Sequence, residues 1–217
     1  MLSPISGVHM NNIKFFSSAA VAIVAPMALL GILVCVVIVT LPLYRQTVAT
    51  LPKPHVTVAD SDVVARSVIM YVFFSKPLAA DSFSTSEQRH LQDIRSLSLK
   101  VATIFAALLV AFLISAIHLR NADRRLLYRS VATSFAVVAV IGVLLAYFIR
   151  SYFDLLFEYF HKVTFRSGNW QFDPTTEKLI VVFPPQLFFA VSLAVLTALI
   201  IFSAVLSVYF YSRYKRL

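Results

Sequence analysis

The sequence predicts an all-α membrane protein: a four-transmembrane-helix bundle with a small mixed extracytoplasmic cap of short helices and a short hairpin. Hydrophobic residues make up 59% of the 217 residues and charged residues only 13%, whereas a soluble domain carries about 25% charged residues. Four apolar runs are long enough to cross a bilayer. Basic residues gather on one side of these runs, as in multi-pass membrane proteins.

The four predicted spans cover about residues 18–43, 97–119, 130–150 and 185–211. Each approaches or exceeds the roughly 20 apolar residues that cross about 30 Å of hydrocarbon. The first run is too long for a signal-peptide core and lacks a small-residue cleavage site, so we interpret it as an anchor. The whole chain, 1–217, is then one integral membrane domain, with a cap formed by residues 44–96 and 151–184.

The placement of basic residues predicts the orientation. The N-terminus, the loop between the second and third spans and the C-terminus together hold eight basic residues and one acidic residue, whereas the remaining segments hold eleven and nine. Cytoplasmic loops are enriched in Lys and Arg, so we expect both termini in the cytoplasm and the cap on the other side of the membrane. The net charge of +9 thus follows topology, and we expect no nucleic-acid partner.

Several classes of chemistry lack their usual residues. The four glycines form no phosphate-binding loop, and no Gly-x-Ser-x-Gly elbow is present. The single cysteine, Cys35, lies in an apolar run, where a reactive thiolate would be costly to form. The spans contain no central Asp, Glu or Lys to mark an ion path. A serine or cysteine acyl-enzyme and a transporter are therefore disfavoured.

Local patterns predict the elements of the cap. Residues 55–58 alternate like a short strand, and residues 61–75 resemble an interfacial helix that Pro77 ends. Ser84 and Glu87 have the spacing of a capping box, so we expect a helix that begins there and continues into the second span. The third span is expected to continue outward over 150–161. Residues 169–172 and 178–183 look like two strands joined by the turn 173–177.

The predicted outer segments hold three histidines: His55, His90 and His161. Imidazole titrates near neutral pH, and His90 and His161 are both expected on helices close to the membrane, so they are the candidate pair for acid–base catalysis. The alternative is that both are ordinary polar side chains of a small cap. Asp93 could orient a histidine or neutralise a neighbouring arginine. A metal site made with Glu87 and Asp93 is disfavoured because no two histidines have ligand spacing on one helix face.

Two sequence signatures resemble one family. Glu87-Gln88-Arg89-His90-Leu91-Gln92-Asp93-Ile94 resembles a Glu-x-x-His-x-x-Asp-Val motif. A second signature comprises Phe160-His161, Trp170, Asp173-Pro174, Leu179-Ile180, Phe183-Pro184 and Phe188-Phe189. Together they resemble the bacterial lipoprotein intramolecular transacylase family, Lit, over nearly the whole chain.

The resemblance implies an enzyme that moves the sn-2 acyl chain of a diacylglyceryl-cysteine lipoprotein to the α-amino group of that cysteine, giving a lyso-form lipoprotein. It implies His161 and His90 as catalytic residues, with Asp93, Glu87, Trp170 and Asp173 binding substrate or supporting the site. We expect lipoprotein and membrane lipid as partners, no cofactor or metal, and a monomer. The resemblance also implies that the membrane is a bacterial plasma membrane, with the active site on its extracytoplasmic side. The alternatives are a non-catalytic lipid- or lipoprotein-binding membrane protein and a metal-dependent membrane hydrolase.

Overall fold

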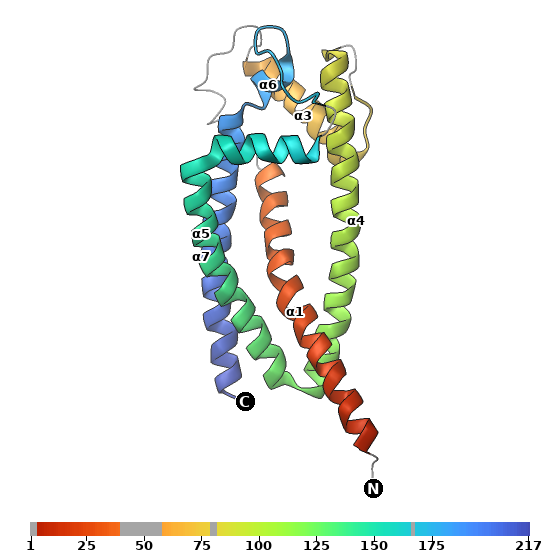
Figure 1. The fold of residues 1–217 in the computed structure, drawn as a ribbon, viewed down its shortest axis with the longest axis vertical. Coiled ribbons are helices and arrows are strands. Elements are labelled where there is room, and N and C mark those ends of the chain that lie inside the picture. Colours follow the sequence, from red (N-terminus) through yellow and green to blue (C-terminus); the bar gives the residue numbers. More distant parts are fainter. Residues whose placement is uncertain (1–3, 40–57, 79–81, 166–167) are drawn as a thin grey trace. The chain divides into compact units, whose positions relative to one another are not determined.

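The computed structural model describes residues 4–39, 58–78, 82–165 and 168–217, and over these residues the chain is helical with no strand (Figure 1). Its elements in chain order are α1 (Pro4–Val39), α3 (Val58–Phe74), α4 (Thr85–Ala122), α5 (Arg124–Thr164), α6 (Lys178–Val182) and α7 (Pro185–Lys215). The chain divides into two compact units. Unit 1 comprises Met1–Val36, Ile104–Tyr147 and Ala194–Leu217, and unit 2 comprises Val37–Thr103 and Phe148–Leu193.

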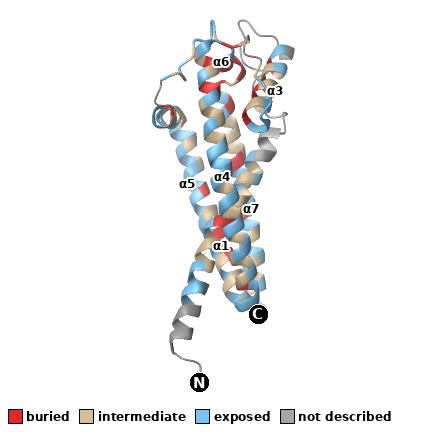
Figure 2. Ribbon diagram, turned by 90° about the vertical axis from the view of Figure 1, so that its right-hand side faces the viewer, coloured by how far each residue is buried: buried red, intermediate tan, exposed pale blue. Residues whose placement is uncertain are grey.

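Four helices, α1, α4, α5 and α7, are long and apolar enough to cross a membrane. Many of their large apolar side chains are exposed (Figure 2), among them Ile114 at 65%, Val140 at 64% and Val208 at 70%. Such continuous apolar exposure is unfavourable in water but suits contact with lipid tails. The predicted all-α, four-span fold class is confirmed, and the chain is a multi-pass membrane protein.

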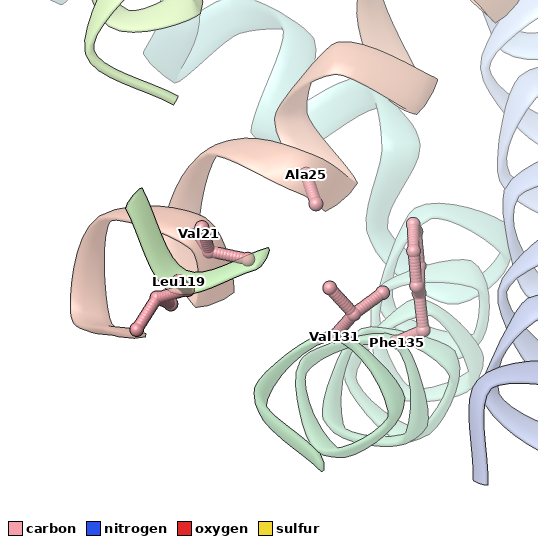
Figure 3. Close-up of a cluster of buried hydrophobic side chains, with 5 residues drawn as sticks. All are labelled: Val21, Ala25, Leu119, Val131 and Phe135. Atoms are coloured by element: carbon pink, nitrogen blue, oxygen red, sulfur yellow. The ribbon is translucent and has the colours of Figure 1, made fainter. Parts of the chain in front are cut away.

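A cluster of buried side chains forms the core of unit 1. Val21 and Ala25 of α1 pack with Leu119 of α4 and with Val131 and Phe135 of α5 (Figure 3). An ion pair lies near the ends of the same helices, where Lys14 Nζ is 3.5 Å from a carboxylate oxygen of Asp123. The other Asp123 oxygen accepts a hydrogen bond from the Leu126 amide at 2.9 Å, which caps the first turn of α5.

The predicted helix over residues 61–75 is confirmed as α3 in unit 2. It ends at Phe74, and the next residue, Ser75, has a left-handed φ of 55°. The Lys76 amide donates to the Met70 carbonyl at 3.1 Å. This bond supplies a partner for a carbonyl of the last turns, and Pro77 cannot continue the helix. The strand expected over 55–58 lies outside the described residues except for Val58, where α3 begins.

The capping box at the start of α4 is confirmed. The Glu87 amide donates to Ser84 Oγ at 3.2 Å, and the Ser84 amide donates to Glu87 Oε2 at 2.7 Å. These reciprocal bonds satisfy two of the amides that a helix N-terminus leaves without partners. From this cap α4 runs without interruption to Ala122, as expected for a helix that continues into the second span.

The predicted hairpin over residues 169–183 is wrong, because residues 178–182 form the short helix α6. The turn before it was anticipated: the Glu177 amide donates to the Asp173 carbonyl at 2.9 Å. After the turn, the Leu179 amide donates to the buried carboxylate of Glu87. A carboxylate at a helix N-terminus stabilises the helix, and this tertiary contact outweighs the β-branched composition of Ile180, Val181 and Val182.

Candidate functional site

His90 lies in the second turn of α4, one turn after Glu87, and only 5% of it is exposed. Glu87 is 1% exposed, and its carboxylate accepts both the Ser84 amide of α4's cap and, at 2.5 Å, the Leu179 amide of α6. One buried carboxylate therefore joins the starts of two helices. Because His90 follows one turn later on the same helix, this junction fixes the part of α4 that carries its imidazole.

His161 lies in the last turn of α5, beyond the residue Tyr152 (φ −137°, ψ 28°) at which the helix is kinked. Its Nδ1 is 2.7 Å from the Phe157 carbonyl oxygen. A carbonyl only accepts hydrogen bonds, so Nδ1 of His161 must carry the proton. In the neutral ring Nε2 then has a free lone pair, which is the arrangement a general base requires.

The two imidazoles lie close together inside a group of aromatic rings. Their ring centroids are 6.1 Å apart, with an angle of 29° between the planes. Phe165 and Phe172 meet the His90 ring edge-on at 4.6 and 5.4 Å, and Trp170 lies 4.9 Å from the His161 ring. These rings bury His90 and cover part of His161, which is half-buried.

Burial affects the protonation of both histidines. Charged residues flank each of them along its helix, as with Arg89 and Lys162, so both rings lie outside the apolar spans. Desolvation, with a smaller repulsion from His161, lowers the pKa of His90 to about 4, and the nearby Asp93 opposes this shift. Desolvation also lowers the pKa of His161, and the hydrogen bond to the Phe157 carbonyl opposes this shift. Both rings are therefore mainly neutral at pH 7.

The histidines form part of the wall of a cavity of about 280 Å³ in unit 2. The lining residues come from α3, α4, the C-terminal end of α5, the segment before α6, α6 itself and the start of α7: Val68, Ile69, Val72, Phe73, His90, Leu91, Ile94, Phe157, His161, Trp170, Phe172, Leu179, Ile180, Phe183, Leu187, Phe188 and Val191. Only His90, His161 and Trp170 among them carry polar side-chain atoms. The cavity thus combines two neutral imidazoles with an otherwise hydrocarbon surface.

The other predicted site residues lie outside this lining. Asp93 accepts a hydrogen bond from Asn169 Nδ2 at 3.4 Å. Asp173 lies in the exposed turn, where its Oδ1 accepts the Thr175 amide at 2.8 Å. Glu87 forms the junction described above, and His55 lies outside the described residues. The structure therefore brings together His90, His161 and Trp170 in the cavity wall, and places Asp93, Asp173 and Glu87 outside it.

Three residues that enclose the site were not singled out from the sequence as members of it: Phe165 and Phe172, which pack on His90, and Asn169, which bonds Asp93. The density of aromatic residues around His161 was the available signal. Within the described residues, no group of three or more His, Cys, Asp or Glu is arranged to hold a metal ion. The chemistry that the arrangement supports is proton transfer beside an apolar binding space.

Comparisons with known proteins agree with this geometry. A model of the family described as lipoprotein intramolecular transacylase Lit matches residues 19–189. Among the curated proteins compared, none matches the sequence significantly.

The chain is also similar to solved structures of the membrane integral lipoprotein intramolecular transacylase Lit from Bacillus cereus, determined in meso. One has a TM-score of 0.77 and 19% identity and covers 95% of this chain and 96% of that chain. Two single-histidine variants of the same protein have TM-scores of 0.76 and 0.75 at 18% and 19% identity, covering 99% and 98% of this chain and 96% of each of those chains. At this identity the likeness establishes a shared fold, whereas the family match extends over most of the sequence. The chain belongs to the lipoprotein intramolecular transacylase Lit family, a family of acyltransferases.

Proposed function

We propose that the chain moves the sn-2 acyl chain of a diacylglyceryl-cysteine lipoprotein to the α-amino group of the same cysteine, and that His161 and His90 catalyse the transfer. The observation that carries the proposal is the pair of neutral imidazoles, 6.1 Å apart, in the wall of an apolar cavity. An acyl transfer between lipid-linked groups needs proton transfer in a site that accepts hydrocarbon. This site has both properties.

In the proposed step, the α-amino nitrogen of the substrate cysteine attacks the ester carbonyl carbon, and His161 Nε2 takes a proton from that amino group. The new C–N bond forms, and the C–O bond to the sn-2 oxygen breaks. The imidazolium of His161 then returns the proton to the departing alkoxide, which is too basic to leave without one. No atom enters or leaves the substrate overall, so the product has the same mass.

The tautomer of His161 supports this assignment, because the bond from Nδ1 to the Phe157 carbonyl directs the lone pair to Nε2. His90 suits a different role. With a pKa of about 4, roughly one ring in a thousand is charged at pH 7, so it is a poor proton donor in the imidazolium form. A neutral ring can still donate an N–H to the oxyanion that forms on the carbonyl oxygen.

Glu87, Trp170 and Asp93 act through the histidines. Glu87 holds the turn that carries His90 against α6, and Trp170 shapes the wall beside His161. Asp93 acts on His90 through its charge, since its hydrogen bond is to Asn169. The donor ester and the acceptor amine belong to one molecule. Holding them at reacting distance and in the right orientation therefore supplies much of the rate enhancement. We place the cap outside the cytoplasm, as the distribution of basic residues indicates.

The test uses a synthetic diacylglyceryl lipopeptide and the purified protein in detergent. His161→Gln and His90→Gln should each lower the rate of N-acylation by at least about 100-fold, with unchanged membrane insertion. His118→Gln provides the matched control, since His118 lies on α4 in unit 1 and does not line the cavity. Full activity in His161→Gln would refute its role as base. Inactivation of the wild type by a chelator would instead favour the metal-dependent hydrolase.

A further inference from the structure

We propose that the cavity in unit 2 holds the carbonyl-proximal part of one acyl chain, roughly its first ten methylene groups, and that this is the chain that migrates. The second acyl chain of the substrate stays outside the cavity, in the bilayer. This inference rests on the proposed acyl transfer. It adds that the enzyme selects its substrate by the length of the migrating acyl chain.

The composition of the wall identifies the class of ligand. Of the lining residues, only His90, His161 and Trp170 carry polar side-chain atoms, and none carries a permanent charge. A headgroup, a phosphate or a peptide backbone would lose its hydration there without gaining partners. Hydrocarbon loses nothing on entering such a space, because a chain that leaves the membrane for it exchanges one apolar environment for another and gains packing contacts with the wall.

The volume of the cavity limits the occupant to one chain. An apolar cavity of about 150 Å³ is known to bind benzene. A methylene group at the packing density of a protein interior occupies about 27 Å³, so 280 Å³ accommodates roughly ten of them. Two chains of the length found in membrane lipids cannot both enter. The imidazoles lie in the wall of this space, so the ester carbonyl beside them belongs to the chain inside it.

Val68 of α3 is the residue best placed to test this limit. It is 7% exposed and packs with Val72, Leu91 and Leu179, which also line the cavity. Val64 lies one turn earlier on α3 and packs against the same cluster, but it does not line the cavity. The pair Val68→Phe and Val64→Phe therefore differs in whether the added ring takes space from the cavity.

The experiment uses diacylglyceryl lipopeptides in which one chain is kept at sixteen carbons and the other varies from six to sixteen. In the wild type, kcat/KM should rise with each methylene added to the sn-2 chain, because each one fills space that would otherwise lack packing contacts, and it should level off near ten carbons. The same change in the sn-1 chain should have little effect. Dependence on total chain length, or equal dependence on both chains, would overturn the inference.

The variants give the second readout. A phenylalanine adds the volume of about two methylenes over valine, so Val68→Phe should level off near eight carbons. The preference for a twelve-carbon over an eight-carbon sn-2 chain should then be lost. Val64→Phe should keep the wild-type preference. Ile180→Ala, which enlarges the cavity, should move the plateau to longer chains.

An unchanged preference in both Val68→Phe and Ile180→Ala would overturn the role of the cavity. Failure of the proposed function would give a different result, because the wild type would then transfer no acyl chain of any length.

Discussion

The hydrogen bonds of Glu87 predict that the substitution Glu87→Gln lowers the free energy of unfolding by about 2–3 kcal/mol. The carboxylate is 1% exposed and accepts the amides of Ser84 and Leu179 through different oxygens. Glutamine has only one side-chain oxygen, and its NH₂ group cannot accept a hydrogen bond. One of these two backbone amides would therefore lose its acceptor. Leaving a buried amide without an acceptor costs about 1–3 kcal/mol, and the surviving bond loses about 1 kcal/mol of its charge-assisted strength. Easier burial of the neutral side chain offsets part of the sum.

The measurement is unfolding in mixed micelles by titration with a denaturing detergent, followed by circular dichroism. Glu177→Gln is the matched control, because Glu177 accepts Ser84 Oγ and the Asp173 amide at 2.9 Å in exposed surroundings, and should cost less than about 1 kcal/mol. Glu87→Gln should also reduce acyl transfer, since His90 depends on this junction. A Glu87→Gln variant as stable as the wild type would refute the argument.

Two further predictions concern protonation and orientation. Because the folded-state pKa of His90 is about 4 against about 6.5 when unfolded, the unfolded chain binds the extra proton, and stability should fall by about 3 kcal/mol as the pH drops from 6.5 to 4. His90→Asn should lack this component, so parallel stability profiles for wild type and variant would contradict it. In a Cys35→Ser background, Thr175→Cys should react with an impermeant maleimide in intact cells and Asn121→Cys only after permeabilisation. The reverse pattern would invert the proposed topology.

The membrane fold and the capping box could be predicted because each depends on local sequence. A run of about 20 apolar residues cannot remain in water at low cost, and the reciprocal bonds of Ser84 and Glu87 need only residues three apart. The helix α6 could not be predicted in this way. Residues 178–183 have β-branched composition, and their helical start depends on the carboxylate of Glu87, which lies more than ninety positions earlier.

The candidate site was likewise predictable only in part. His90 and His161 could be chosen for their chemistry and their places beside apolar runs, but their mutual distance and the tautomer of His161 depend on the packed structure. The packing of Phe165 and Phe172 around His90, and the cavity itself, arise from segments far apart in the chain. No local pattern encodes such contacts.

The measurement that tests the central claim most directly is mass spectrometry of the N-terminal peptide of a lipoprotein from cells that make this chain. With the wild type, the peptide should keep the mass of the diacylglyceryl form, while its fragments show one acyl chain on the cysteine nitrogen and one left on the glycerol. With His161→Gln, both chains should remain on the glycerol. Wild-type peptides that keep both chains there, or that lose the mass of one chain, would contradict intramolecular transfer.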